Sequence, residues 1–322
     1  MKTKLVYILV SDTSDFYYEQ TLLSATSARM WNPDAEIIIL IDDKTNATLV
    51  DSRTALSDII SNKIVVDFPD NITPKQRSRF LKTSLRKHIE GDFLYIDSDT
   101  VVCQSLQDAD NLTIEMGAVP DSHSGASPDE TVLQRIALLG GNYQDGDLYY
   151  NSGVMYVKDT PRTHLFFEEW YNIYEQGLKK KLDFDQPSLF ICNQKMKLIN
   201  TIDGEFNCQI FTGGLPYLGY AKIIHAFNTY SFNAYFGGSI FVFSDTSYLK
   251  EIKQKGRLDE KDLKLLKEAK RQFHGDYILV YGQNLEYNKS ALFHLFADYR
   301  KLFHLLECFG RVLLKLMKIF GK

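Results

Sequence analysis

Two carboxylates stand directly after a short apolar run in the first third of the sequence. Asp97 and Asp99 follow Phe93–Ile96, whose residues favour a buried β-strand. On an extended chain the side chains of residues i and i+2 point to the same side, so both carboxylates can bind one divalent cation. Acids at this end of an α/β strand lie where such sheets bind ligands, and they are costly to bury alone. The pattern favours a metal site over two acids that cap a turn.

The segments before this pair predict alternating strands and helices. Leu5–Val10 and Glu36–Ile41 are continuous apolar runs on either side of a helical segment, Phe16–Met30. Continuous runs are typical of strands buried on both faces, so we expect an α/β fold with a mostly parallel sheet covered by helices. The other expected elements are strands at Lys63–Phe68, Gly117–Pro120, Ser152–Val157 and 223–225, and helices at Ala47–Ser61, Pro74–His88, Glu130–Leu139 and Leu165–Lys180.

Composition and charge exclude several classes of protein. The 322 residues are 44% hydrophobic and 24% charged, which is typical of a globular protein rather than a disordered one. Lys and Arg number 37 against 41 Asp and Glu, so a net charge of −4 offers no general attraction to nucleic acid. The four cysteines are widely spaced, and no apolar run is as long as a signal-peptide core or a spanning helix. We expect a cytoplasmic protein with reduced thiols.

The acid pair is compatible with two classes of enzyme. In the haloacid-dehalogenase-like phosphatases a strand ends in Asp-x-Asp-x-Thr or Val, and residues 97–101 resemble that motif. Asp97 would then be the nucleophile and Asp99 the acid/base. In those enzymes, however, this strand normally opens the domain, and the later Gly-Asp pair that they need has no match, because Gly91-Asp92 and Gly275-Asp276 stand in other contexts.

The second class is the nucleotide-sugar-dependent glycosyltransferases, which the chain resembles over residues 1–230. Six segments resemble the family 8 retaining glycosyltransferases, a family that includes bacterial lipopolysaccharide and capsule hexosyltransferases, and they occur in the family's order. They are the acidic loop Val10-Ser11-Asp12, the basic helix segment with Arg79 and Lys82, the strand end Asp97-Ser98-Asp99, the stretch Tyr150–Met155 with Asn151 and Gly153, the Asp185-Gln186 pair, and Ile223-Ile224-His225.

This resemblance implies a Rossmann-like fold of the glycosyltransferase A type, with a mixed, mostly parallel sheet and a helical C-terminal extension. Asp97, Asp99 and His225 would hold Mn²⁺, with Mg²⁺ as the alternative, because an imidazole beside two carboxylates suits manganese better than calcium. Arg79 and Lys82 share a helix face from which they can reach a phosphate. The implied donor contacts are Val10, Ser11, Asp12, Arg79, Lys82, Ser98, Asn151 and Gly153.

Asp185 and Gln186 are the candidate catalytic residues. Double displacement with retention needs a nucleophile near the anomeric carbon, and the Asp185 carboxylate has suitable chemistry. In the family this Asp is usually assigned to sugar hydroxyls and the Gln lies near the anomeric carbon, so we favour front-face attack with the leaving phosphate accepting the proton. Two segments depart from the family's pattern. Pro187 replaces a common second acid, and Ala226-Phe227-Asn228 replaces a segment whose Lys contacts phosphate.

The C-terminal segment has the pattern of a helix that lies on a membrane surface. We expect a catalytic domain at residues 1–245 and a helical extension at 246–322, which is charge-dense over Leu249–Phe273. Within 298–322, the basic residues of one helix would share an arc opposite Leu, Met and Phe, as on helices that bind anionic lipid. Docking on the protein's own core, or a break at Gly310, would also fit. The basic residues are Arg300, Lys301, Arg311, Lys315, Lys318 and Lys322.

The function expected from these features is metal-dependent transfer of a hexose, with retention, from a nucleotide sugar to a glycan or glycolipid acceptor. UDP is the family's usual carrier, and the tail would place the enzyme on the inner face of the membrane. Besides the phosphatase, the alternatives are an inactive module that binds sugar nucleotide or membrane, and a nucleotidyltransferase. The last fits poorly, because the first loop lacks a Gly-rich triphosphate cradle.

Overall fold

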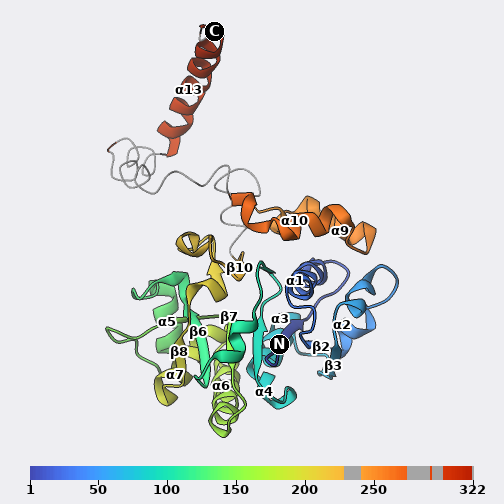
Figure 1. Ribbon diagram of the computed structural model, residues 1–322. Coiled ribbons are helices and arrows are strands. Elements are labelled where there is room, and N and C mark those ends of the chain that lie inside the picture. Colours follow the sequence, from blue (N-terminus) through green and yellow to red (C-terminus); the bar gives the residue numbers. More distant parts are fainter. Residues whose placement is uncertain (228–240, 274–290, 292–299, 321–322) are drawn as a thin grey trace. The chain divides into compact units, whose positions relative to one another are not determined.

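The computed structural model of the protein describes residues 1–227, 241–273, 291 and 300–320 (Figure 1). By their contacts these residues divide into two units, Met1–Gln272 and Phe273–Lys322. Some residues used in the sequence-based predictions lie outside the described ranges, namely Asn228, Gly275, Asp276 and the tail positions 298–299 and 321–322.

The first unit is built on a seven-stranded sheet with the strand order β3-β2-β1-β4-β7-β6-β8. Strand β1 pairs in parallel with β2 and β4, β2 with β3, and β6 with β8, whereas β7 runs antiparallel to β4 and β6. The mixed, mostly parallel sheet predicted from the sequence is therefore confirmed. The strands are β1 (Lys4–Leu9), β2 (Ile37–Asp42), β3 (Asn62–Val66), β4 (Phe93–Ile96), β6 (Met116–Pro120), β7 (Tyr150–Val157) and β8 (Ile199–Thr201).

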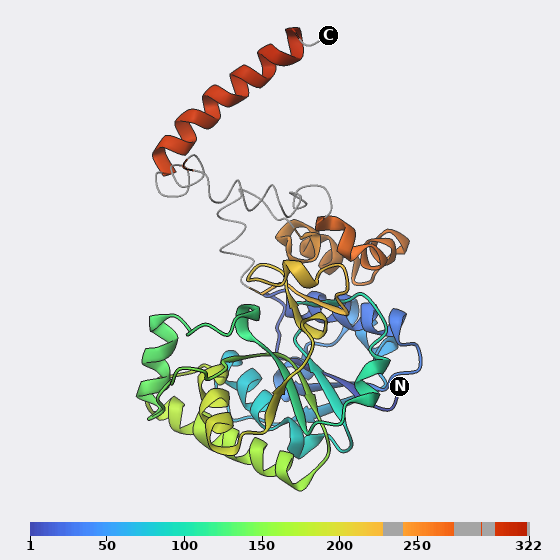
Figure 2. The ribbon, with the colours of Figure 1, turned by 60° about the vertical axis from the view of Figure 1, so that its left-hand side comes forward.

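Helices cover both faces of this sheet because its central strands are apolar on both sides. On β1, Val6 and Ile8 belong to the same core as Leu81 of α3 (Pro74–Thr83) and residues of α6 (Pro161–Lys179). Tyr7 points to the opposite face, where its hydroxyl accepts a hydrogen bond from Ser24 of α1 (Tyr17–Trp31). Figure 2 shows α6 along one side of the sheet, and α9 (Thr246–Lys255) and α10 (Glu260–Lys267) on the other.

A second, three-stranded sheet lies beside the acid pair. Its order is β5-β10-β9, with β5 at Thr100–Val102, β9 at Cys208–Gln209 and β10 at Ile223–His225. Strand β10 is antiparallel to β5 and parallel to β9. Strands β5 and β9 are too short to leave an apolar pattern in the sequence, and we did not predict them.

Three predicted helices are interrupted. No continuous helix spans 47–61, because α2 (Asp43–Ala47) gives way to two short 3₁₀ turns and Asp51 has a left-handed φ of 50°. The helix expected at 74–88 breaks at Ser84, whose hydroxyl bonds to the carbonyl oxygen of Phe80, and continues as α4 (Leu85–His88). The segment 249–273 turns at Gly256, which ends α9 with a φ of 66°.

The bounds of other elements lie within a few residues of the bounds predicted from the sequence. Helices α5 (Glu130–Leu138) and α6 lie where they were expected. The Asp185-Gln186 pair opens a further helix, α7 (Asp185–Met196), which we did not predict.

Among the described residues of the second unit, Arg300–Phe320 form a long amphipathic helix, α13, which runs through Gly310 without a break. Helices α9, α10 and α13 confirm that the C-terminal segment is helical where the structure describes it. Leu305, Phe309 and Met317 are exposed on this helix, as are Arg311 and Lys315. Within the described ranges, the helices are too short or too polar to cross a membrane.

Candidate active site

The carboxylates of Asp97 and Asp99 and the imidazole of His225 lie together at the end of β4. Strand β5 begins directly after Asp99, and its antiparallel pairing with β10 sets His225 opposite Thr100. One ligand atom from each of the three side chains lies within 4.8 Å of the others. His225 Nε2 is 3.2 Å from Asp99 Oδ1. Strand pairing thus unites the three side chains that the sequence suggests as metal ligands.

The space between these side chains suits a divalent cation. Two carboxylates and one imidazole form a donor set that manganese and magnesium accept. Gly153 on β7 borders the space, where a Cβ atom would lie 2.2 Å from His225 Cε1 and 2.9 Å from Asp97 Oδ2. Burial would raise the pKa of Asp99, but the charge and hydrogen bond of His225, a backbone hydrogen bond and the charge of Lys82 together outweigh burial and lower the pKa. The residues present therefore fit a cation, and glycine keeps room for it.

Tyr95 and Lys82 orient the carboxylate of Asp97. The Tyr95 hydroxyl donates a hydrogen bond to Asp97 Oδ1, and Lys82 Nζ lies 3.2 Å from the same oxygen. Burial, and after it the charge of Asp97, raise the pKa of Tyr95 well above its ordinary value, so the hydroxyl remains a donor. The ammonium group of Lys82 also lies over the Tyr95 ring, 4.9 Å from its centroid.

Asp185 forms ion pairs with both of the predicted basic residues. Its Oδ1 is 2.9 Å from Arg79 Nε, and its Oδ2 is 3.5 Å from Lys82 Nζ. Ser152 Oγ donates a further hydrogen bond to Oδ2 at 2.8 Å. Burial would raise the pKa of Asp185, but Arg79 and Lys82 outweigh it and hold the pKa far below its usual value. Because Lys82 contacts both Asp97 and Asp185, it links the metal-binding acids to the candidate catalytic pair.

Arg79 and Lys82 do share one face of α3, and that face is directed to the site rather than to solvent. Lys75 on the same helix instead pairs with Asp183, at 2.8 Å. Gln186 is half-buried in the first turn of α7. Helix α3 therefore supplies two cations to the site, and Gln186 directly follows Asp185, which pairs with both, in the chain.

The loop after β1 is held together by its own side chains. The Asp15 carboxylate accepts hydrogen bonds from Ser11 Oγ at 2.6 Å and from the Asp12 backbone nitrogen at 2.9 Å. Arg53 donates to the Asp12 carbonyl oxygen at 2.5 Å and to Ser11 Oγ at 3.0 Å. No sequence motif marks Asp15 or Arg53, because their role depends on how the loop folds back on itself.

A cavity of about 560 Å³ extends from this loop to the acid pair. Its lining includes Val10, Arg79 and Ser98, which are three of the predicted donor contacts, together with Asp97 and Asp99. A cavity of this size with a few charged groups on its wall is typical of a small-molecule site. The predicted contacts that do not border it are Ser11, Asp12, Lys82, Asn151 and Gly153.

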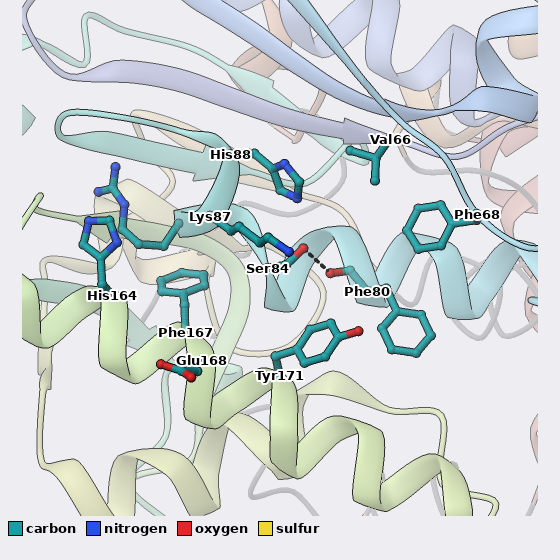
Figure 3. A pocket seen from close by; sticks show the side chains of 11 residues that line it. Val66, Phe68, Phe80, Ser84, Lys87, His88, His164, Phe167, Glu168 and Tyr171 are labelled. Atoms are coloured by element: carbon teal, nitrogen blue, oxygen red, sulfur yellow. Dashed lines mark hydrogen bonds between the residues drawn. The ribbon is translucent and has the colours of Figure 1, made fainter.

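A second cavity, of about 540 Å³, opens between α3–α4 and α6 (Figure 3). Phe68, Phe80 and Tyr171 form an aromatic wall at one end, and His88 and His164 lie toward the other. None of the predicted site residues lines this cavity. The arrangement of charged side chains therefore places the candidate active site at the first cavity.

Asn207 connects the imidazole of His225 to Asn151. Asn207 Oδ1 lies 2.9 Å from His225 Nδ1, and Asn207 Nδ2 donates to Asn151 Oδ1 at 3.0 Å. Asn151 in turn donates to Asp121 Oδ1 at 2.8 Å. Asn207 and Asp121 carried no signal in the sequence, because they lie in short 3₁₀ turns that only tertiary packing brings to the site.

Comparisons with known proteins identify the fold. No family model matches the sequence, and no curated protein matches it. The crystal structure of the galactosyltransferase LgtC in complex with donor and acceptor sugar analogues is similar, with a TM-score of 0.51, 18% identity, and coverage of 80% of this chain and 98% of that one. A structure of an active-site mutant of LgtC gives a TM-score of 0.51 and 17% identity, with the same coverage. The chain therefore has a glycosyltransferase fold.

Proposed function

We propose that the protein is a metal-dependent retaining glycosyltransferase similar to family 8, which transfers a hexose from a nucleotide sugar to a glycan or glycolipid. The observation that carries this proposal is the convergence of Asp97, Asp99 and His225 beside a cavity, in a fold similar to that of LgtC. LgtC was solved with donor and acceptor sugar analogues. The six resembling segments support a UDP-linked donor.

We assign Asp97, Asp99 and His225 as the ligands of Mn²⁺, with Mg²⁺ as the alternative. Bound there, the ion would stabilise the negative charge that develops on the departing diphosphate. Tyr95 and Lys82 would keep the Asp97 carboxylate oriented toward the ion through the contacts described above. We also assign the loop Val10-Ser11-Asp12, Arg79, Lys82, Ser98, Asn151 and Gly153 to the donor site.

The surroundings of Asp185 favour front-face attack over a covalent intermediate. Its carboxylate forms ion pairs with Arg79 and Lys82, which hold its pKa low and reduce its basicity. A weakly basic carboxylate is a poor nucleophile but a good acceptor for sugar hydroxyls. We therefore propose that Asp185 holds the sugar while the leaving phosphate accepts the acceptor's proton. Gln186→Ala should then slow transfer more than it weakens donor binding.

The test of the metal site is Asp99→Asn. We expect the variant to lose Mn²⁺-dependent UDP binding in calorimetry and to unfold at the wild-type temperature. Asp34→Asn, at an exposed position, is the matched control and should bind like the wild type. Undiminished binding by Asp99→Asn would contradict the assignment.

Substrate turnover separates this proposal from the alternatives. With Mn²⁺ and a panel of sugar nucleotides, a transferase should slowly release free nucleotide by hydrolysis, whereas a phosphatase would hydrolyse a generic phosphomonoester. The third side chain at the acid pair is the imidazole of His225, not a further carboxylate, which favours the transferase. An inactive module would show neither reaction, and the intact set Asp97, Asp99 and His225 argues against it.

We further propose that residues 298–322 attach the protein to an anionic membrane on its cytoplasmic face. The support is α13, whose apolar side chains Leu305, Phe309 and Met317 are exposed while Arg311 and Lys315 supply positive charge. Such a helix binds in the plane of the lipid head groups. This attachment would bring the enzyme to a lipid-linked acceptor, such as a growing surface glycan.

A further inference from the structure

A chain of buried amide groups runs from Asp121 to the imidazole of His225. Asn207 is fully buried, and Asn151 and His225 are 4% and 2% exposed. The two amides are therefore shielded from water, so their hydrogen-bond partners must come from the protein. The links are Asp121 to Asn151, Asn151 to Asn207, and Asn207 to His225 Nδ1.

The backbone of Gly153 determines the direction of this chain. Its N–H group, which can only donate, lies 2.9 Å from Asn151 Oδ1. The amide nitrogen of Asn151 consequently faces the carboxylate of Asp121, which accepts. Turning the Asn151 amide over would set two donors against each other at Gly153 and two acceptors against each other at Asp121.

The same reasoning determines the orientation of the Asn207 side-chain amide. Because Asn151 Oδ1 is an acceptor, the group of Asn207 that faces it must be the nitrogen, at 3.0 Å. Asn207 Oδ1 is then left to face His225 Nδ1, at 2.9 Å. An amide oxygen only accepts, so Nδ1 carries a proton, and in the neutral ring the Nε2 lone pair is directed to the acid pair.

We infer that Asn207 is a positioning residue that selects the Nδ1–H tautomer of His225 and so prepares Nε2 to bind a cation. His225 Nε2 already lies 3.2 Å from Asp99 Oδ1, on the side of the ring away from Asn207. Hydrogen bonds of this kind fix the ring orientation of metal-binding histidines and raise their affinity for the ion. The inference rests on the metal site of the proposed function, but not on the identity of the sugar or the acceptor.

The tautomer can be observed directly in the metal-free, full-length protein. Long-range ¹H–¹⁵N spectra of ¹⁵N-histidine protein, recorded at a pH where the nitrogen shifts show neutral rings, distinguish Nδ1–H from Nε2–H. The chain has seven histidines, and loss of one signal set in His225→Gln identifies the relevant ring. We expect Nδ1–H for His225 in the wild type and a mixture of tautomers in Asn207→Leu. Nε2–H in the wild type would overturn the inference.

Binding of Mn²⁺, followed by the electron paramagnetic resonance of the free ion, tests the consequence. Asn207→Leu should weaken Mn²⁺ binding about 10–100-fold, the range found when outer-shell partners are removed. Asn207→Asp keeps an acceptor for His225 Nδ1 but loses the donor to Asn151 Oδ1, so it should retain more of the Mn²⁺ affinity than Asn207→Leu and less than the wild type. If both variants weakened Mn²⁺ binding equally, or if Asn207→Leu did not weaken it, the proposed role of Asn207 would be contradicted.

Asn32→Leu is the matched control. Asn32 is 5% exposed, and its amide bonds to the Ala28 carbonyl oxygen at 3.1 Å and to the Leu106 nitrogen at 2.7 Å, outside the site. The control should lose stability without loss of Mn²⁺ affinity. If the Mn²⁺ affinities follow the expected order but no sugar nucleotide is ever turned over, the proposed function fails while the inference stands.

Discussion

The ion pairs of Asp185 make the stability of the protein depend on pH. Because its pKa in the folded protein is below the ordinary 3.8, the ionised carboxylate stabilises the fold at neutral pH. That contribution is lost as the pH falls below about 4 and through the folded-state pKa. Its size depends on Arg79 and on Lys82, whose side chain is almost completely buried. We therefore expect Asp185 to stabilise the folded protein in addition to its proposed role of binding the sugar.

We predict that Asp185→Asn lowers the free energy of unfolding at pH 7 by about 3 kcal/mol, because it leaves two cations without their buried partner. The difference from the wild type should shrink as the pH falls, since the wild-type carboxylate also loses its charge. Urea unfolding of both proteins at a series of pH values measures this. A destabilisation that is equal at pH 7 and at pH 3 would rule out the ion pairs as its source.

Gly153 shows how a single missing side chain leaves room for the close approach of His225 and Asp97. We predict that Gly153→Ala reduces transfer activity by about 100-fold, the effect of displacing reacting groups by roughly 1 Å. The reason is that the new methyl group would overlap His225 and crowd Asp97. Assays with Mn²⁺ and the donor measure this loss. Gly219→Ala, where no atom lies within 4 Å of the added Cβ, is the control and should remain active.

At the scale of secondary-structure elements, helix α3 is the support for Arg79 and Lys82. It begins with a capping box, in which the Gln76 nitrogen donates to Thr73 Oγ1 at 3.3 Å and the Thr73 nitrogen donates to Gln76 Oε1 at 3.0 Å. Thr73 also borders the cavity that extends from the loop after β1 to the acid pair. Helix α6 begins in the same way, with Thr160 and Thr163, but outside the site.

These two capping boxes provide a matched pair of variants. Thr73→Ala and Thr160→Ala should each cost about 1 kcal/mol of stability, and Thr160→Ala somewhat more because Thr160 also donates to Glu115. Only Thr73→Ala should weaken Mn²⁺-dependent UDP binding, since it loosens the first turn of α3. Urea unfolding and calorimetry test both statements. Equal effects of the two variants on UDP binding would show that α3 has no special role.

At the scale of the whole molecule, α13 is a separate amphipathic element in the second unit. We predict that deletion of residues 298–322 abolishes sedimentation with anionic vesicles and leaves transfer to a soluble acceptor unchanged. The charge reversal Arg311→Glu with Lys315→Glu should weaken sedimentation, and added salt should do the same, because the attraction to lipid is partly electrostatic. If the truncated protein still sediments with the vesicles, another surface binds them.

The sequence by itself determined the features that depend on neighbouring residues. Apolar runs such as Phe93–Ile96 indicated buried strands, and the spacing of Asp97 and Asp99 put both carboxylates on one side of an extended chain. The spacing of Arg79 and Lys82 likewise put both cations on one helix face. These patterns follow from the repeat of the strand and the helix, so they need no knowledge of the rest of the fold.

Only the tertiary structure decided which distant residues meet. His225 reaches the acid pair because β10 pairs with β5. Asn207 and Asp121 join it from 3₁₀ turns that are too short to leave a periodic pattern in the sequence. The helix break at Ser84 likewise depends on one side-chain hydrogen bond that competes with the helix. Strand pairing and buried hydrogen bonds between distant segments are selected by the free energy of the whole core. These contacts therefore cannot be predicted from a short stretch of sequence.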